Sequence, residues 1–211
     1  MLYGEVNTVT IDGQQYSGIQ VRVPNPPKVA VLGLPTNQQM IDRFWKQKSI
    51  RRSLGNGKSQ SEFQPNLKAD LELFNALRQD KGPEFDEYEA SNAIGKLIYC
   101  EVKDCEAVND QYRITLKTPF GDTVHTMGLP TLKDIALYRR SLVSATDLPH
   151  GQEELRFRIE PAAALYDSVV AGVTGYATGI IAKDVPVHHK SAVVADLVQA
   201  FDANTDLDPN S

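Results

Sequence analysis

Long apolar runs are absent from this chain of 211 residues. No stretch approaches the roughly 18 consecutive apolar residues that a membrane-spanning helix needs. The N-terminal sequence MLYGEVNTVT has neither a basic leader nor an apolar segment of signal-peptide length. These absences predict no membrane partner and a cytoplasmic location.

Cysteine is scarce as well. Cys100 and Cys105 are the two cysteines, too few for a disulfide scaffold. Their odd separation would point them to opposite faces of one extended strand, and a lone pair falls short of the four ligands of a structural zinc site. We expect reduced thiols, no bound metal and no cofactor.

Catalytic signatures are also missing. The stretch LGNGKSQ from Leu54 resembles a phosphate-binding loop, but the position that should hold its first glycine is Arg52. His188 and His189 are adjacent, which is unsuited to chelation on a helix, and we expect them to be structural and partly exposed. The sequence therefore predicts that the protein is not an enzyme. A small enzyme with a dispersed site stays an alternative, because triad members need not be neighbours in sequence.

What the chain does contain is an internal repeat. Residues 19–36 read IQVRVPNPPKVAVLGLPT and residues 114–131 read ITLKTPFGDTVHTMGLPT, so seven of eighteen positions are identical without a gap. After one gap the match extends upstream, where LYGEV from Leu2 resembles IYCEV from Ile98. Internal repeats indicate duplicated structural units. We predict a first repeat unit over residues 1–96, a second over 97–203, and an acidic, mobile tail over 204–211.

Both repeats have the same predicted anatomy. Segments rich in Val, Ile, Tyr and Thr, separated by turn residues, predict a three-stranded meander. Gly-Leu-Pro-Thr then ends the last strand, and Thr36 and Thr131 are placed to act as helix N-caps. Two further helices close each unit. The predicted fold class is α+β, with two tandem homologous units, each a small antiparallel meander packed with about three helices.

Apolar positions at helical spacing predict which side chains form the core. In the first unit these positions include Leu77 and Ile94. In the second unit they predict a helix from about Pro186 to Phe201 with an inward-facing apolar side. Val173 is assigned to a shorter helix before it. Trp45 shares a stripe with Phe44, so we expect Trp45 to be largely buried, with a cost of about 3–5 kcal/mol for Trp45→Ala.

One feature distinguishes the repeats. Between Arg43 and Lys58 the first repeat has basic residues and no acid, whereas the matching stretch of the second is mixed in charge. The basic residues are Arg43, Lys46, Lys48, Arg51, Arg52 and Lys58. A feature present in one repeat only is better explained by a partner than by the fold, so these six are the candidate interaction residues. Replacing the last four with Ser should leave the melting temperature nearly unchanged.

The partner of this basic stretch can be of two kinds. A protein partner or self-association is expected, because residues 80–89 and 202–208 are acidic and complementary patches suit head-to-tail contacts. Nucleic acid is the alternative, since basic side chains neutralise phosphates. The net charge of −5 argues against a general nucleic-acid binder.

The general plan of short meanders followed by helices resembles the small structural and assembly proteins of tailed bacteriophages. The phrases FGDTVHTMGLPT and VPVHHKSAVVADL carry this likeness. The chain resembles virion accessory proteins, neck proteins and tail-assembly chaperones in style. This resemblance implies a non-enzymatic protein–protein interaction module within a larger assembly, located in the host cytoplasm or the virion. A nucleic-acid-associated protein that uses the basic stretch is the alternative function.

Overall fold

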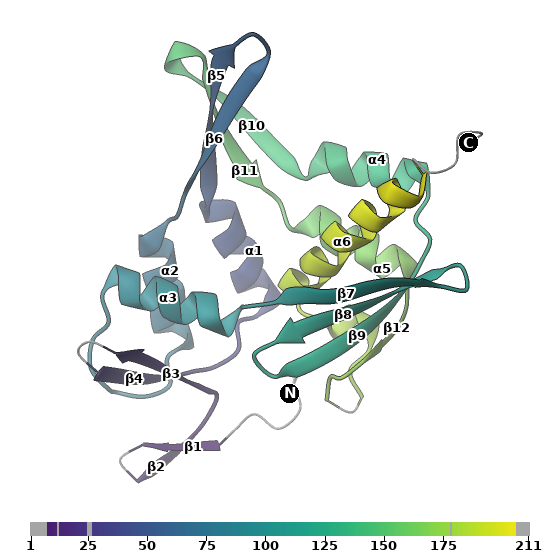
Figure 1. The fold of residues 1–211 in the computed structure, drawn as a ribbon. Helices are drawn as coiled ribbons and strands as arrows, with labels where there is room; N and C mark the ends of the chain where they lie inside the picture. The colour runs from purple at the N-terminus through teal and green to yellow at the C-terminus, as the bar shows by residue number, and fades with distance from the viewer. Residues whose placement is uncertain (1–7, 12, 25–26, 178, 206–211) are drawn as a thin grey trace. The chain divides into compact units, whose positions relative to one another are not determined.

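The computed structural model describes residues 8–11, 13–24, 27–177 and 179–205, and it has an α+β fold with antiparallel sheets, as predicted (Figure 1). Its helices are α1 (Asn37–Lys46), α2 (Leu67–Leu77), α3 (Glu87–Leu97), α4 (Leu132–Ser141), α5 (Glu160–Val169) and α6 (Val187–Thr205). Its strands are β1 (Thr8–Ile11), β2 (Gln14–Ser17), β3 (Ile19–Pro24), β4 (Pro27–Leu32), β5 (Lys48–Gly55), β6 (Lys58–Gln64), β7 (Glu101–Val108), β8 (Gln111–Thr118), β9 (Gly121–Gly128), β10 (Val143–Leu148), β11 (Gln152–Phe157) and β12 (Val170–Thr174).

The chain forms two compact units. The N-terminal unit comprises the described residues of 7–97 together with 140–159, and the C-terminal unit comprises those of 98–139 and 160–211. One boundary between the units follows Leu97, and two further boundaries enclose residues 140–159. The hairpin β10–β11 belongs to the N-terminal unit although it lies in the second half of the sequence, because β11 pairs with β5. The predicted 204–211 tail lies mostly outside the described residues, and α6 continues to Thr205.

The order of elements recurs along the chain. The hairpin β3–β4 is followed by α1, the hairpin β5–β6, α2 and α3. The hairpin β8–β9 is followed by α4, the hairpin β10–β11, α5 and, after β12, α6. Thus each half contains a hairpin, a helix, a second hairpin and two helices in the same order.

The predicted helix caps are confirmed in both halves. Thr36 accepts a hydrogen bond from the backbone N–H of Gln39 at 3.2 Å, and the Gln39 side chain accepts one from the N–H of Thr36. Thr131 and Asp134 make the same reciprocal pair at the start of α4, with distances of 3.2 and 3.1 Å. These capping boxes explain why the shared word Gly-Leu-Pro-Thr ends a strand and starts a helix.

The hairpins before these caps differ in register. The closing pair is Pro24↔Pro27 in β3–β4 but Thr118↔Gly121 in β8–β9, one residue earlier in the alignment of the repeats. Thr118 explains the difference, because its hydroxyl accepts from the N–H of Phe120 at 3.1 Å and donates to the carbonyl of Gly121 at 2.8 Å. The first repeat has Val23 at this position, which offers no such bond.

The halves also share the way in which the second helix returns to its sheet. Arg78 directly follows α2 and forms an antiparallel bridge with Leu32, the last residue of β4. Val170 directly follows α5 and pairs antiparallel with Met127, the residue aligned with Leu32. This contact was not predicted from the sequence.

Several predicted elements need correction. The meander of the second half is confirmed as β7–β8–β9, but in the first half β1–β2 and β3–β4 form separate two-stranded sheets in the described part of the chain. The two hairpins β5–β6 and β10–β11 were not predicted. Val173 lies in β12 rather than in a helix, because it pairs with His125.

Several predicted core positions are confirmed in each unit. In the N-terminal unit Leu77 and Ile94 are buried, and α3 packs against α2 and β3. In the C-terminal unit Val194 and Leu197 are buried on α6, which packs against α5, β7 and β8. Each unit therefore has its own apolar core.

Candidate interaction surface

The basic residues of the first repeat lead into a four-stranded sheet within the N-terminal unit. Its strand order is β10–β11–β5–β6, with every neighbouring pair antiparallel. In Figure 1 the two hairpins run together away from α1 and α2. The second strand of one hairpin, β11, is thus joined to the first strand of the other, β5.

Glycine chemistry shapes the tip of the longer hairpin. Gly55, Asn56 and Gly57 all have positive φ angles, of 79°, 51° and 73°. Glycine tolerates this region without strain, and asparagine is enriched there. The Gly-Asn-Gly segment is thus the turn of the β5–β6 hairpin.

The six candidate residues fall into three environments. Arg43 and Lys46 lie on α1, Lys48, Arg51 and Arg52 on β5, and Lys58 at the start of β6. Arg43 makes its contacts within the fold. The Nε of Arg43 lies 2.8 Å from Asp70, whose carboxylate is almost wholly buried and also accepts from the Ser91 hydroxyl at 2.7 Å. Arg43 therefore serves the fold more directly than it serves a partner.

Two of the β5 residues are paired with acids of the second half. The Nζ of Lys48 lies 3.0 Å from Glu154, and the Nε of Arg51 lies 2.6 Å from Glu153. Glu154 also accepts from Arg156 at 2.8 Å, and the hydrogen bonds from Lys48 and Arg156 lower the pKa of Glu154. The acids that pair with Lys48 and Arg51 thus lie in the second hairpin of the sheet and not in residues 80–89.

The remaining basic residues face solvent. Lys46 reaches Glu72 at 3.1 Å, but both side chains are about half exposed. Arg52 and Lys58 are exposed and form no ion pair with any residue in the described part of the chain. They are the members of the set most available to a partner.

Trp45 contradicts its prediction. Its exposed fraction is 44%, whereas Met40 on the same helix is buried. The guanidinium carbon of Arg156 lies 5.7 Å from the centroid of the indole, and Arg156 donates to the Trp45 carbonyl at 2.9 Å. Trp45 is therefore an anchor for β11 and not a core residue.

The sheet also exposes apolar side chains. Residues paired across antiparallel strands face the same side, and alternate residues along a strand do so too. By this register Phe63 on β6, Val143 on β10 and Phe157 on β11 share one face, together with buried Leu155. Phe63 is 59% exposed. A pocket of about 340 Å³ opens near the tip and is lined in part by Arg51, Asp147 and Glu153.

The C-terminal unit contains a buried network of histidine and tyrosine. His125 on β9 lies 2.7 Å from the Tyr166 hydroxyl and 3.0 Å from that of Thr123. Tyr176 lies 2.9 Å from His189 on α6. The expectation of partly exposed histidines at 188 and 189 is wrong, because both side chains are buried.

Burial decides the charge of these histidines. Desolvation lowers the pKa of His125 to about 4 and, together with the neighbouring histidines, that of His189 to about 2. Both rings are therefore neutral at physiological pH and act as hydrogen-bonding partners. Since neither is exposed, the network has the character of a polar core rather than of an open catalytic site.

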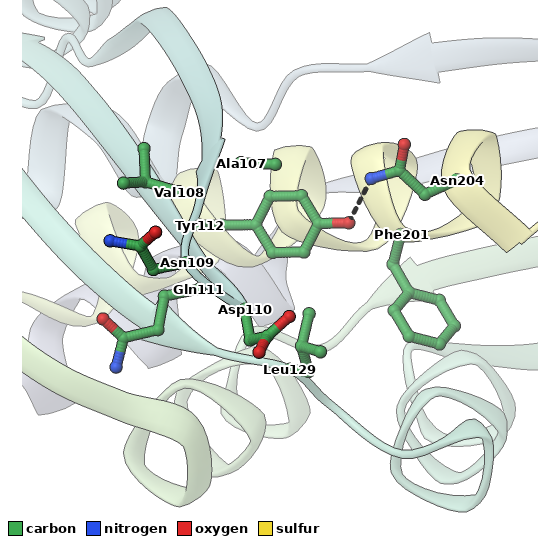
Figure 2. A pocket seen from close by; sticks show the side chains of 9 residues that line it. All are labelled: Ala107, Val108, Asn109, Asp110, Gln111, Tyr112, Leu129, Phe201 and Asn204. Atoms are coloured by element: carbon green, nitrogen blue, oxygen red, sulfur yellow. Dashed lines mark hydrogen bonds between the residues drawn. The ribbon is translucent and has the colours of Figure 1, made fainter.

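A second pocket of about 350 Å³ lies in the C-terminal unit beside the turn that joins β7 and β8 (Figure 2). The Tyr112 hydroxyl accepts a hydrogen bond from the Asn204 side chain at 2.6 Å, as Figure 2 shows. Phe201 and exposed Leu129 supply apolar surface, and Asp110 is the charged lining residue. Neither histidine of the buried network lines this pocket or the pocket at the hairpin tip.

The described residues contain no cluster of three or more His, Cys, Asp or Glu side chains that could hold a metal ion. Cys100 is partly buried, and desolvation raises the pKa of its thiol to about 11. Burial also raises the pKa of Cys105. Both cysteines are free thiols.

Within the described part of the chain, none of the helices combines the length and apolar character needed to cross a membrane. No family model, no curated protein and no solved structure matches the chain. The interpretation of the four-stranded sheet therefore depends on its own geometry.

Proposed function

We propose that this protein is a non-enzymatic protein–protein interaction module of a larger assembly, built from two tandem homologous units. The resemblance to structural and assembly proteins of tailed bacteriophages gives the kind of assembly that we have in mind. The observation that carries the proposal is the β10–β11–β5–β6 sheet, in which a hairpin from each half is combined into a single projecting surface.

Three features of the halves support the tandem units. Their elements follow the same order, their capping boxes coincide with the repeated Gly-Leu-Pro-Thr, and the first residue after the second helix pairs with aligned positions, Leu32 and Met127. A shared order could arise by chance in a small α+β protein, but the return contact at aligned residues is a specific tertiary feature. We infer that one unit was copied and that the two hairpins then combined.

Two features favour a protein partner over nucleic acid. Four of the six basic residues, Arg43, Lys46, Lys48 and Arg51, already face carboxylates of the same chain. The face of the sheet that contains Leu155 also carries exposed Phe63 and Phe157. A surface of paired charges and exposed aromatic residues resembles a protein interface more than a phosphate-binding groove.

Catalysis has less support than interaction. The groups with strongly shifted pKa, among them His125 and His189, lie in the buried network and outside both pockets. A catalytic acid or base must reach its substrate. We therefore assign these groups to stability.

The test is a titration of the full chain with a labelled duplex DNA and a labelled single-stranded RNA, at several salt concentrations, beside light scattering of the chain alone. The proposal expects weak nucleic-acid binding that the exchange of Arg52 and Lys58 for Ser changes little. Binding with a steep log–log salt slope that this double variant flattens would instead establish the nucleic-acid function, since each lost phosphate contact removes close to one unit of slope.

A further inference from the structure

The four-stranded sheet ends in two edges of different kinds. One edge is β10, the first strand of its hairpin, and the other is β6, the second strand of its hairpin. Neither outer edge pairs with a strand in the described part of the chain. Inside the sheet, the junction joins the second strand of one hairpin, β11, to the first strand of the other, β5.

The two free edges are therefore counterparts of the two strands that already pair. By element order β6 corresponds to β11 and β10 corresponds to β5. The strands alternate in direction across the sheet, so β10 of a second molecule placed beside β6 would again be antiparallel. On the basis of the proposed interaction function, we propose that β6 of one copy pairs with β10 of a second copy and extends the sheet head to tail.

The register of the sheet predicts which residues meet. Pairing across the sheet places Asp147, Glu153, Arg51 and Ser61 in one row. If the next copy continues the rows, Ser61 lies opposite its Asp147, and Glu62 lies opposite its Thr146. No like charges are opposed in either pair, and like charges directly opposite would destabilise the contact.

The edges have little of the usual protection against pairing. Soluble proteins guard exposed edges with charged side chains, proline, bulges or covering segments. The sequence of β10 is VSATDL and that of β6 is KSQSEFQ, so neither contains proline, and the bulge of the β5–β6 hairpin lies on β5. Their charged residues are Asp147 on β10 and Lys58 and Glu62 on β6, and the proposed register opposes none of them to a like charge. Six of the seven residues of β6 are exposed.

Exposed apolar side chains favour a second copy as the occupant. Phe63 stands on β6, and Val143 and Phe157 stand at the β10 end of the same face. In the extended sheet Phe63 would come beside Ala145 of the neighbour and diagonal to its Val143, within reach of an aromatic side chain. Each copy offers both surfaces, so the contact is heterologous and builds a ring or a filament according to its twist.

Disulfide cross-linking tests this pairing in the full chain. In a background with Cys100→Ala and Cys105→Ala, Ser61→Cys and Asp147→Cys are made singly and together, then exposed to a mild oxidant. Within one chain β6 and β10 are separated by three strand spacings, about 14 Å, which is beyond the roughly 7 Å that a disulfide spans. Any disulfide between these positions must therefore join two molecules.

The proposal expects a ladder of dimers, trimers and larger species from the double variant on a non-reducing gel. It expects dimers from a mixture of the two single variants and little dimer from either alone. A matched control combines Ser61→Cys with Leu148→Cys, which faces the other side of the sheet and should cross-link far less. Melting curves of each variant check that it folds.

Three results would overturn the proposal. Dimers of the Ser61→Cys variant alone, as abundant as in the mixture, would mean that β6 pairs with β6. Oligomers by light scattering without any cross-link would place the contact elsewhere. A chain that stays monomeric and does not cross-link would exclude self-pairing, whereas the interaction function itself fails only by the nucleic-acid titration above.

Discussion

The two halves of this protein differ in the chemistry of their buried polar groups. In the first half, the return segment after α2 is held by an ion pair, in which Asp80 accepts from Arg78 at 3.0 Å and from the backbone N–H of Val31 at 2.7 Å. In the second half, the corresponding region contains the neutral network around His125 and Tyr176. Buried polar groups can thus be accommodated either as an ion pair or as a neutral network, provided that every member has a partner.

The second contrast lies in the hairpins that form the shared sheet. The hairpin of the first half is basic and that of the second half carries the acids, so they complement each other within one chain. A duplicated unit that kept identical hairpins would oppose like charges at this junction. The difference in charge therefore fits a division of roles between the halves, and it can be tested by changing one side at a time.

The largest expected effect is at the ion pair buried beneath α1. Arg43→Ala would leave the Asp70 carboxylate buried beside Ser91 without its cation, and removal of one partner of a buried pair typically costs about 3–5 kcal/mol. Urea denaturation measures the free energy of unfolding. Lys46→Ala is the matched control on the same helix, because its pair with Glu72 is exposed and is worth about 0–1 kcal/mol. Equal losses in the two variants would contradict the assignment of Arg43 to the fold.

The next largest effect is a loss of stability of the C-terminal unit at acidic pH. The pKa of His125 is lowered to about 4 in the folded protein, against about 6.5 when unfolded, so the unfolded chain binds the proton more tightly. The stabilisation is complete above pH 6.5 and is lost as the pH falls toward 4, by about 3 kcal/mol for this residue. Protonation of His189 adds to the loss, because its pKa is also lowered.

The N-terminal unit should resist acid longer. Burial alone would raise the pKa of Asp80, but the hydrogen bonds from Arg78, Val31 and Gly82 hold it below its usual value. Its contribution is therefore lost only as the pH falls below about 4. Trp45 is the single tryptophan and lies in this unit, so its fluorescence should stay native at pH 5 while circular dichroism already declines. Fluorescence and circular dichroism transitions that coincide in the wild type would refute this difference, as would a His125→Gln variant with the same acid transition as the wild type. His150→Asn is the control for loss of an exposed histidine.

How much of this could be predicted from the sequence depends on the range of the contacts. The capped helices at Thr36 and Thr131 and the buried positions Leu77 and Ile94 follow from local patterns, and all are confirmed. The hairpins β5–β6 and β10–β11 were missed, because their strands are largely polar and two-sided and show no apolar alternation.

The pairing of Lys48 with Glu154 was missed for a different reason. These residues are 106 positions apart, and only strand pairing between the halves brings them together. The charge difference between the repeats was visible in the sequence, but it could not indicate that Lys48 and Arg51 pair with Glu154 and Glu153 of the second half. Trp45 was placed in the core because it shares a stripe with Phe44, whereas its indole is exposed and lies beside the guanidinium of Arg156.

A moderate effect is expected at Trp45. With 44% of its surface exposed, Trp45→Ala should cost about 1–2 kcal/mol, less than the roughly 3–5 kcal/mol typical of a buried aromatic residue. Arg156→Ala should reduce that cost, because the cation–π contact is already lost in its absence. A double-mutant cycle by urea denaturation measures the coupling, and strict additivity would argue against the contact.

The smallest effects are expected at the exposed charges of the sheet. Exchange of Lys48 and Arg51 for Ser should cost about 0.5–1 kcal/mol for each, since their pairs are partly exposed. The same exchange at Arg52 and Lys58 should leave the melting temperature nearly unchanged, because neither has a described ion-pair partner. A similar loss in both double variants would remove the distinction between paired and free cations that the two hairpins suggest.

The measurement that bears most directly on the account is the molar mass in solution, determined by light scattering over a range of concentrations. The comparison is between the wild type and a variant with Ser61→Asp, which places a carboxylate opposite Asp147 of the next copy while facing Arg51 of its own chain. We predict a wild-type mass that rises with concentration, and a variant that melts like the wild type but keeps the mass of one chain. A wild type that keeps the mass of one chain at every concentration, or a folded variant that associates equally well, would contradict the account.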